Sequence, residues 1–252
     1  MQDLKISLIT VCYNAESTIS RTIESVIAQN FENIELIIID GGSTDNTVRC
    51  INQYKNHVSL FLSEPDKGIY DAMNKGINLA SGDIIGTLNA DDFFANNDVL
   101  KSVGDAFIQH DPEIVYGDLD YVNDEGRVIR KWRSKQYFYG MFNWGWMPPH
   151  PTFYCRRDLF EKHGSYSLEL GSAADYELML RFMHVYRLKA VYIDKVLVKM
   201  NIGGISNKNI GNRLKALFYD FKAMQNHDLS LPIVSLAFKP LRKITQYLNG
   251  RQ

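Results

Sequence analysis

Cysteine is scarce in this sequence. Cys12, Cys50 and Cys155 are the only three, and they lie far apart along the chain. An odd number of cysteines at such spacings fits neither a disulfide framework nor a zinc site. A reducing compartment is the simplest interpretation, and we therefore expect a cytoplasmic protein.

Long apolar runs and an excess of charge of one sign are also missing. The N-terminal segment MQDLKISLITVCYN carries an apolar run too short for a signal peptide, and no stretch approaches the roughly 20 apolar residues of a membrane-spanning helix. The 28 basic and 29 acidic residues give a formal net charge of −1. This balance is not typical of a general nucleic-acid-binding protein, so we expect no nucleic-acid partner.

Glycine-rich phosphate loops are absent near the N-terminus. The segment TVCYNAEST follows the first apolar run, where a nucleotidyltransferase would normally carry such a loop. No G-x-G-x-x-G follows this run either, which disfavours a dinucleotide-dependent oxidoreductase.

What the first half does contain is a regular alternation of apolar runs and amphipathic segments. The predicted strands are residues 5–11, 34–40, 58–63 and 83–88. The predicted helices are residues 19–27, a short helix starting at Ser43 or Thr44, and residues 69–80. Near-continuous apolar strands between helices predict a mostly parallel sheet covered on both faces, which is an α/β fold. Ligands of such sheets bind beyond the carboxyl ends of the strands, where the polar residues of this chain should converge.

The second half has a different pattern. Residues 114–132 predict a β-hairpin with its turn at 123–126. After an aromatic-rich segment, we expect a short helix closed by Gly164 and another helix that begins near Ser172. Neither a repeat nor a low-complexity linker divides the chain. We expect one mixed α/β domain, residues 1–205, followed by a helical extension, residues 206–252.

Two adjacent carboxylates, Asp91 and Asp92, follow the predicted strand at residues 83–88. Like charges side by side cost stability unless water or a cation shares them. Mg²⁺ and Mn²⁺ prefer carboxylate oxygens, and Mg²⁺ is usually held by one or two carboxylates together with substrate phosphates. The pair therefore predicts a divalent-metal site and implies a diphosphate ligand. The alternative is that a carboxylate caps the next helix, which starts at Asn97 or Asp98.

Four ordered segments resemble the family 2 glycosyltransferases, which have the GT-A nucleotide-sugar-binding fold. The segments are SLITVCYNAESTISRTIESVIAQ, IELIIIDGGSTDNT, SEPDKGIYDAMNKGINLASGDIIGTLNADD and AADYELMLR. The resemblance covers residues 4–200, and the subgroup most similar to this chain is the bacterial exopolysaccharide and O-antigen transferases. It implies a nucleotide-binding half, residues 1–112, and an acceptor-binding half, residues 113–205.

The resemblance implies a site for a nucleoside diphosphate sugar at the strand ends. Thr10, Val11 and Tyr13 would hold the base, and the Tyr13 ring could stack on uracil. Asp40 matches the family aspartate that hydrogen-bonds the base. Without a ligand role, Tyr13 would pack on the first helix and Asp40 would cap the helix that follows it.

The family's metal motif falls on the two carboxylates. Asp91 and Asp92 match aspartates that contact the ribose and the metal, Mn²⁺ or Mg²⁺, and Asn89 stands where the family usually has the first aspartate of the motif. Lys75 would offset the diphosphate charge, and Asp66 would orient the sugar hydroxyls. The alternatives are a solvated lysine and a simple turn.

Asp175, in GSAADYELMLR, matches the family's catalytic base, which deprotonates the acceptor hydroxyl as it attacks the anomeric carbon. The first turn of a helix favours the ionised carboxylate that this role needs. Ala174 replaces the glutamate that the family often has before this aspartate. The alternative is that Asp175 only starts a helix, in which Arg181 could pair with Glu177.

Two further residues are candidate acceptor contacts. His150, in PPHPTFY, lies where related sequences place the floor of the acceptor site, although a structural loop histidine is the alternative. Trp146 belongs to a cluster of aromatic residues that begins at Tyr137 and suits stacking on sugar rings. Such a cluster could equally form a core or an interface.

The C-terminal segment, residues 229–252, contains Lys239, Arg242, Lys243 and Arg251 among apolar residues and has no acidic residue. A basic amphipathic segment of this kind can lie on an anionic membrane surface. We expect peripheral contact with the cytoplasmic face of the inner membrane. Docking on the domain, or on a second subunit in a homodimer, is the alternative.

Together these features predict an inverting, metal-dependent glycosyltransferase of bacterial surface polysaccharide biosynthesis. It would transfer a single sugar from a UDP-sugar to a polyprenyl-diphosphate-linked saccharide, since the Gln-x-x-Arg-Trp motif and the long spans of processive synthases are missing. The alternatives are a non-catalytic nucleotide-sugar-binding protein and a nucleotidyltransferase.

Overall fold

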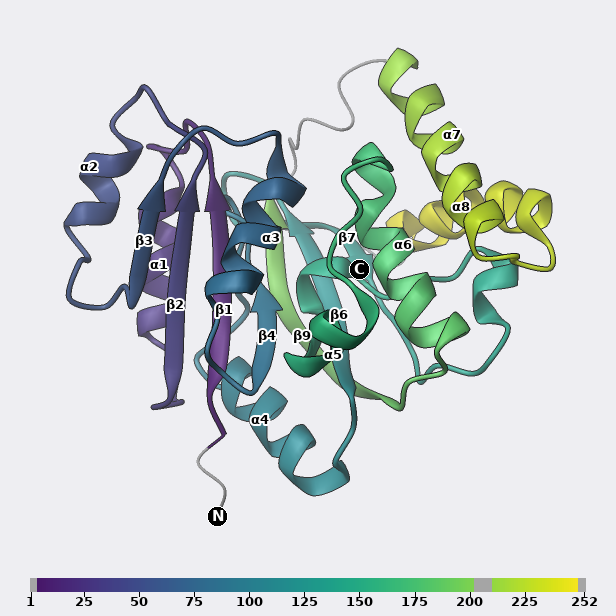
Figure 1. Cartoon of the computed structure of the whole chain (residues 1–252), viewed down its shortest axis with the longest axis horizontal. Helices are drawn as coiled ribbons and strands as arrows, with labels where there is room; N and C mark the ends of the chain where they lie inside the picture. The colour runs from purple at the N-terminus through teal and green to yellow at the C-terminus, as the bar shows by residue number, and fades with distance from the viewer. Residues whose placement is uncertain (1–3, 202–209, 249–252) are drawn as a thin grey trace.

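A nine-stranded mixed sheet runs through the computed structural model, which describes residues 4–201 and 210–248 (Figure 1). In spatial order the strands are β3 (Leu60–Ser63), β2 (Ile34–Asp40), β1 (Ile6–Cys12), β4 (Ile84–Thr87), β8 (Tyr154–Arg156), β6 (Ile114–Val122), β9 (Ala190–Asn201) and β5 (Phe93–Phe94), with β7 (Val128–Trp132) paired to β6. Strands β3, β2, β1 and β4 are all parallel, as predicted for the first half. Strand β8 runs antiparallel to both β4 and β6. Strand β7 pairs antiparallel with β6, and β5 pairs antiparallel with β9, so the whole sheet is mixed.

Helices cover both faces of the sheet because successive strand residues point to opposite sides. Leu8 of β1 packs in the core formed with α1 (Ile19–Ile27), α2 (Thr47–Asn52) and α4 (Val99–His110). Ile9 packs in the core formed with α3 (Ile69–Leu79), α5 (Asp158–His163) and α6 (Ala174–Leu180). The predicted α/β architecture with two covered faces is confirmed.

Short helical turns connect the strands and helices of the second half of the domain. They are the 3₁₀ turns η1 (Met141–Trp144), η2 (His150–Thr152) and η3 (Gly171–Ala173), and the π-helical turn η4 (Arg181–Val185). The β6–β7 hairpin, the end of α5 at Gly164 and a helix starting close to Ser172 are confirmed. The predicted start of α2 was wrong, because residues 43–46 form a hydrogen-bonded turn and the helix begins only at Thr47.

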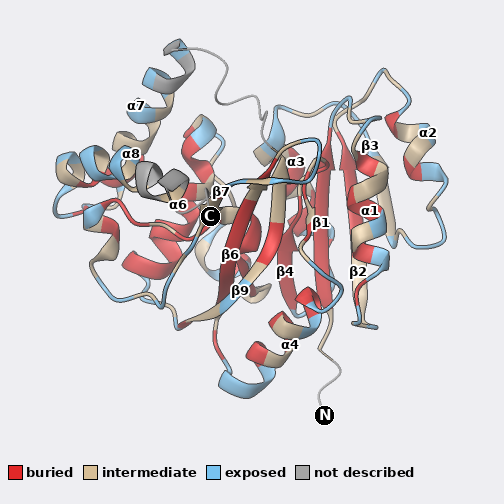
Figure 2. Cartoon of the chain, turned by 180° about the vertical axis from the view of Figure 1, so that it is seen from behind, coloured by how far each residue is buried: buried red, intermediate tan, exposed pale blue. Residues whose placement is uncertain are grey.

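The last two helices, α7 (Ile210–Asn226) and α8 (Pro232–Leu248), pack against the second half of the domain (Figure 1). His227 lies 2.6 Å from Glu177 of α6, and the Ser235 hydroxyl donates a 2.7 Å hydrogen bond to the carbonyl of Phe142. Docking on the domain, which was the alternative to a membrane-bound tail, is therefore observed for one side of these helices. The outer sides are exposed (Figure 2). The predicted boundary at residues 205 and 206, and Arg251, lie outside the described residues.

Candidate active site

The carboxyl ends of β1, β2 and β4 meet at one edge of the sheet. Cys12 of β1 is the register partner of Asp40, and the amide of Leu88, just beyond β4, donates to the carbonyl of Ile9. Beyond the strands, the amide of Asn14 donates a 2.8 Å hydrogen bond to the hydroxyl of Ser43. The prediction that these polar segments share one edge is confirmed.

The residues predicted to hold the base differ in their exposure. Thr10 and Val11 are buried in β1, and the hydroxyl of Thr10 has no hydrogen-bond partner. Tyr13 is 64% exposed, so its ring is not packed away against α1. An exposed ring at the ligand edge can stack on a base.

Asp40 is fully buried and already accepts several hydrogen bonds. Its Oδ2 accepts from the amide of Ser43 at 3.0 Å and from the hydroxyl of Ser63 at 2.6 Å. These bonds hold the turn after β2, which is close to the capping alternative, although the helix itself starts later. The contact of Asp40 with a base stays a prediction. Burial raises the pKa of the adjacent Cys12 thiol, and the Asp40 carboxylate adds to this rise.

Asp66 lies directly against the end of β2 because Gly41 has no side chain. A Cβ atom on Gly41 would come within 2.4 Å of the Asp66 carboxylate. Asp66 also accepts a 2.7 Å hydrogen bond from the amide of Gly68, which forms the turn given as its alternative role. Lys75 is not simply solvated, since its ammonium group lies 2.8 Å from the carboxylate of Glu64 and this hydrogen bond raises the pKa of Lys75. Contacts of either side chain with a donor stay predictions.

The two adjacent carboxylates have unequal surroundings. Asp92 is fully buried, whereas Asp91 is partly exposed. The side-chain amide nitrogen of Asn89 donates a 3.1 Å hydrogen bond to Oδ2 of Asp92. However, Oδ1 of Asp92 and Oδ1 of Asn89 are buried without a partner. Burial raises the pKa of both carboxyls, and for Asp92 the charge of Asp91 adds to the rise. Strand β5 follows directly and α4 starts after Asp98, so the helix-cap alternative is wrong.

This set of oxygens fits a divalent cation bound together with a phosphate ligand. The side chains of Asn89, Asp91 and Asp92 offer hard oxygen donors, and buried oxygens without partners carry a free-energy cost that a cation would remove. In residues 4–201 and 210–248, no cluster of three His, Cys, Asp or Glu side chains has metal-binding geometry. A cation held here would therefore need ligands from a substrate, as Mg²⁺ usually does.

Asp175 and His150 form a close pair on the second half of the domain. Nδ1 of His150 lies 3.2 Å from Oδ2 of Asp175, and the two side chains are 29% and 16% exposed. Asp175 also interacts with Tyr70 of α3: burial raises the pKa of Tyr70 well above its usual value, and the Asp175 carboxylate adds to this rise. Asp175 lies at the start of α6, so a helix-start role is also compatible with its position.

The loop before α6 is held against α3 by reciprocal hydrogen bonds. The side-chain amide nitrogen of Asn74 donates to the backbone carbonyl of Tyr166, and the backbone amide of Tyr166 donates to Oδ1 of Asn74, both at 2.9 Å. The rings of Tyr70 and Tyr166 are 5.4 Å apart. Helix α3, which carries Lys75, is thereby fixed relative to the loop that leads to α6.

Comparison with known proteins decides the family. The sequence model described as "Glycosyl transferase family 2" matches residues 7–164, which is more than half of the chain. The chain belongs to glycosyltransferase family 2. It is 31% identical over 257 residues to an uncharacterized glycosyltransferase of Mycobacterium tuberculosis, covering 98% of this chain and 91% of the relative. It is 29% identical over 217 residues to a PGL/p-HBAD biosynthesis glycosyltransferase of Mycobacterium bovis, covering 80% of this chain and 78% of the relative.

Solved structures confirm the GT-A fold of this family 2 glycosyltransferase. Staphylococcus aureus TarS 1–349 in complex with UDP superimposes with a TM-score of 0.69 at 19% identity, covering 96% of this chain and 72% of that one. The mannosyltransferase PcManGT of Pyrobaculum calidifontis, in complex with GDP-Man and Mn²⁺, gives a TM-score of 0.66 at 14% identity, covering 98% and 73%.

Sequence reasoning missed three side chains that hold the predicted metal motif of this glycosyltransferase. Asn201, at the end of β9, donates a 3.0 Å hydrogen bond to the carbonyl of Asp91, and Arg21 of α1 donates to the same oxygen at 3.3 Å. The hydroxyl of Thr22 donates to the carbonyl of Asp92 at 2.8 Å. A buried threonine on the inner face of α1 is a weak signal for such a contact. The sequence carries no signal for the contact of Asn201, because its partner Asp91 lies 110 residues away.

Trp146 lies mostly in the core of the enzyme. Its ring is 5% exposed, stacks on Tyr137 and makes an edge contact with Phe142. This is the core alternative given for the aromatic cluster, and an acceptor contact of Trp146 stays a prediction. The predicted pair of Glu177 and Arg181 is confirmed at 2.7 Å.

Proposed function

We propose that this family 2 glycosyltransferase is inverting and metal-dependent, and that it transfers one sugar from a UDP-sugar to a polyprenyl-diphosphate-linked saccharide in bacterial surface polysaccharide biosynthesis. The observation that carries the proposal is the partly exposed Asp175 carboxylate beside His150. Three printed names support the substrate classes: TarS was solved with UDP and with UDP-GlcNAc, PcManGT with GDP-Man and Mn²⁺, and the Mycobacterium bovis relative is named for PGL/p-HBAD biosynthesis.

On the donor side, the exposed ring of Tyr13 stacks on the uracil at the strand edge. Asn89, Asp91 and Asp92 would hold a divalent cation, which would supply positive charge to the departing diphosphate. Arg21 and Asn201 fix the backbone of this motif through the carbonyl of Asp91, so the carboxylates are already oriented before the donor binds.

On the acceptor side, Asp175 accepts the proton of the attacking hydroxyl. The bond from the acceptor oxygen to the anomeric carbon forms as the bond from that carbon to the diphosphate breaks, and UDP leaves from the opposite face. A single displacement of this kind inverts the anomeric configuration. His150 holds the carboxylate of Asp175 in one orientation through its Nδ1 atom.

The outer faces of α7 and α8 support peripheral contact with the inner membrane on its cytoplasmic side, where a polyprenyl-linked acceptor would be found. Leu214, Phe218 and Ile233 are 64%, 63% and 74% exposed. Within residues 4–201 and 210–248, no helix has both the length and the apolarity needed to cross a bilayer.

The testing experiment separates donor binding from transfer. Asp175→Asn should keep the UDP-induced shift in thermal unfolding in the presence of Mn²⁺, which amounts to about 2.7 kcal/mol at 100 times the dissociation constant. It should lose nearly all transfer from a UDP-sugar. The control is Asp158→Asn, which also removes a carboxylate from the first turn of a helix but lies at an exposed site paired with Lys162. Normal turnover in Asp175→Asn would exclude Asp175 as the base, and binding of UDP without transfer in the unmodified protein would favour a non-catalytic binding protein.

A further inference from the structure

The first turn of α3 connects the predicted donor edge with the predicted base. Helix α3 begins directly after the turn in which the amide of Gly68 donates a 2.7 Å hydrogen bond to Oδ1 of Asp66. Tyr70, the second residue of α3, packs against the core that α3 forms with α5 and α6. One turn later, Asn74 binds the loop before α6 through the two hydrogen bonds described above. Tyr70 therefore lies on a fixed segment beside α6.

The phenol of Tyr70 interacts with the carboxylate of Asp175. The Tyr70 ring is partly buried, with its centroid 5.4 Å from that of Tyr166. Burial raises the pKa of Tyr70 well above its usual value, and Asp175 adds to the rise through its charge and through a hydrogen bond between the two side chains. A phenol with a raised pKa keeps its proton, so Tyr70 is the donor of this hydrogen bond and the carboxylate is the acceptor.

The Asp175 carboxylate has further partners in other elements. Nδ1 of His150 lies 3.2 Å from Oδ2, and the backbone amide of Tyr176 donates to Oδ1 at 2.8 Å. Tyr166 is also near, since burial raises its pKa and the charge of Asp175 contributes to the rise, but the hydroxyl of Tyr166 bonds to Thr87. A carboxylate has about four lone-pair positions, so three donors leave one position for an acceptor hydroxyl.

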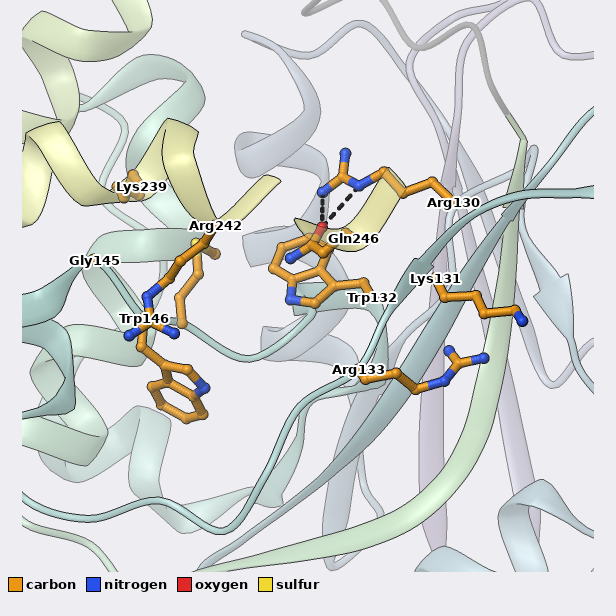
Figure 3. Close-up of a pocket in the computed structure, with 10 residues that line it drawn as sticks. Arg130, Lys131, Trp132, Arg133, Gly145, Trp146, Lys239, Arg242 and Gln246 are labelled. Atoms are coloured by element: carbon orange, nitrogen blue, oxygen red, sulfur yellow. Dashed lines mark hydrogen bonds between the residues drawn. The ribbon is translucent and has the colours of Figure 1, made fainter. Parts of the chain in front are cut away.

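Helix α6 is held independently by α8. Nζ of Lys239 on α8 lies 3.5 Å from the centroid of the Tyr176 ring. Figure 3 shows Lys239 at the edge of a pocket that Gly145 also lines, and a Cβ atom on Gly145 would come within 2.6 Å of the backbone nitrogen of Lys239. These contacts do not involve Tyr70. Removal of the Tyr70 hydroxyl should therefore change how the side chain of Asp175 is held, and should leave the docking of α6 in place.

We propose that Tyr70 is a positioning residue of this enzyme, whose phenol holds the Asp175 carboxylate together with the imidazole of His150. The inference rests on the proposed function and deepens it, because it names a second group that orients the base. Tyr70 transfers no proton itself. Since Tyr70 follows the turn at Asp66, the base is oriented from the same segment that would orient the donor sugar.

The test compares Tyr70→Phe with Tyr154→Phe. Tyr154 is the matched control because it is fully buried in β8 and its hydroxyl has no hydrogen-bond partner. The readout is the ¹³C NMR titration of the Asp175 carboxyl, whose resonance is assigned by its loss in Asp175→Asn. In Tyr70→Phe the titration midpoint should move to higher pH by about one unit, because a hydrogen bond to an ionised carboxylate favours the ionised form. Tyr154→Phe should leave the midpoint unchanged.

A purely structural role of the Tyr70 ring predicts a different result. Phenylalanine keeps the ring contact with Tyr166, so the Asp175 midpoint would then be the same in Tyr70→Phe and the unmodified protein, and the inference would be overturned. A shift in Tyr166→Phe but not in Tyr70→Phe would also overturn it, because the other phenol would be the donor.

Turnover shows whether the hydrogen bond serves the reaction. The probe is release of UDP from UDP-GlcNAc in the presence of Mn²⁺, with water as the acceptor. Tyr70→Phe should lower kcat about tenfold and change KM by less than about twofold, because the base samples unproductive orientations while the donor contacts are kept. A raised KM with unchanged kcat would overturn the positioning role and assign Tyr70 to donor binding.

Asp175→Asn separates failure of this inference from failure of the proposed function. If Asp175→Asn loses the release of UDP while Tyr70→Phe keeps a normal kcat, the base is supported and the role of Tyr70 is wrong. If Asp175→Asn itself keeps normal turnover, the proposed base is wrong, whatever the titration midpoint in Tyr70→Phe.

Discussion

Nδ1 of His150 lies 3.2 Å from Oδ2 of Asp175, although the two residues come from a 3₁₀ turn and a helix that are separate in the sequence. The contact leaves the second carboxylate oxygen of Asp175 near the backbone amide of Tyr176, at 2.8 Å. The imidazole is therefore placed where it can orient the proposed base, and no hydrogen bond or ion pair links it to Asn89, Asp91 or Asp92 among the described residues.

His150→Ala should reduce transfer by about tenfold to a hundredfold, because a catalytic carboxylate without its positioning partner samples unproductive orientations. Binding of UDP with Mn²⁺ should be unchanged. The measurement is kcat together with the UDP-induced thermal shift, and His150→Gln should recover part of the activity through its amide donor. A loss of UDP binding in His150→Ala would show that the residue acts on the donor instead.

Asp91→Ala should abolish the part of the UDP thermal shift that requires Mn²⁺, because the partly exposed carboxylate of Asp91 is the accessible one of the pair. Electron paramagnetic resonance of bound Mn²⁺ measures the same loss without any turnover. Asp105→Ala is the control, since it removes an exposed carboxylate that pairs with Lys101. Equal Mn²⁺ binding in Asp91→Ala and the unmodified protein would move the metal away from this motif.

Asn201→Leu should weaken binding of UDP with Mn²⁺ by about fivefold, since it frees the motif backbone by removing a hydrogen bond to the carbonyl of Asp91 worth about 1 kcal/mol. The affinity is measured by calorimetry. Asn201→Asp, which keeps the size of the side chain but loses the donor, should behave similarly. If both variants bind as tightly as the unmodified protein, Arg21 and Thr22 are sufficient to hold the motif.

Glu177 gives the docking of α7 a pH dependence. Burial opposes its ionisation, but hydrogen bonds from His227 and Arg181 outweigh burial and lower the pKa of Glu177 below its usual value of 4.5. A carboxyl with a lowered folded-state pKa stabilises the protein above the unfolded-state pKa, and this stabilisation is lost as the pH falls through the folded-state pKa.

The midpoint of thermal unfolding should therefore fall more steeply below pH 4.5 in the unmodified protein than in Glu177→Gln. Differential scanning calorimetry over this pH range gives the two slopes, and comparing slopes allows for any loss of stability in the variant itself. Glu161→Gln, at a carboxylate that is 73% exposed, is the control and should keep the slope of the unmodified protein. Parallel curves for Glu177→Gln and the unmodified protein would contradict the assignment.

Local sequence patterns predicted the strands and helices whose conformation is determined by residues within the same segment. The apolar run of β2 and the spacing of Ile19, Ile23 and Val26 in α1 were sufficient, because a strand buried on both faces and a helix buried on one face each leave their own apolar pattern. The start of α2 was not predictable in this way, since the side chains of Asp40 and Asp45 compete for the amides that a helix would use.

The candidate site was predictable residue by residue but not as a set of contacts. Asp91, Asp92 and Asp175 were found from motifs, whereas the pairing of Asp175 with His150 depends on the order of the strands in the sheet. The support of Asp91 by Asn201 depends on β9 returning beside β6 and β5. The docking of α8 depends on its close approach to Gly145, where a Cβ atom would lie 2.6 Å from the backbone nitrogen of Lys239, and no local sequence pattern predicts this contact.

Membrane association should depend on the outer faces of α7 and α8. Phe218 and Ile233 are 63% and 74% exposed, and each apolar side chain buried in the membrane interface would contribute about 1.5 to 3 kcal/mol. In co-sedimentation with vesicles of anionic phospholipid, the double variant Phe218→Glu with Ile233→Glu should bind at least about tenfold more weakly. The control is Ile108→Glu, at a 55% exposed position on α4. If Ile108→Glu reduces binding equally, only the net charge matters and the outer faces of α7 and α8 are not the membrane contact.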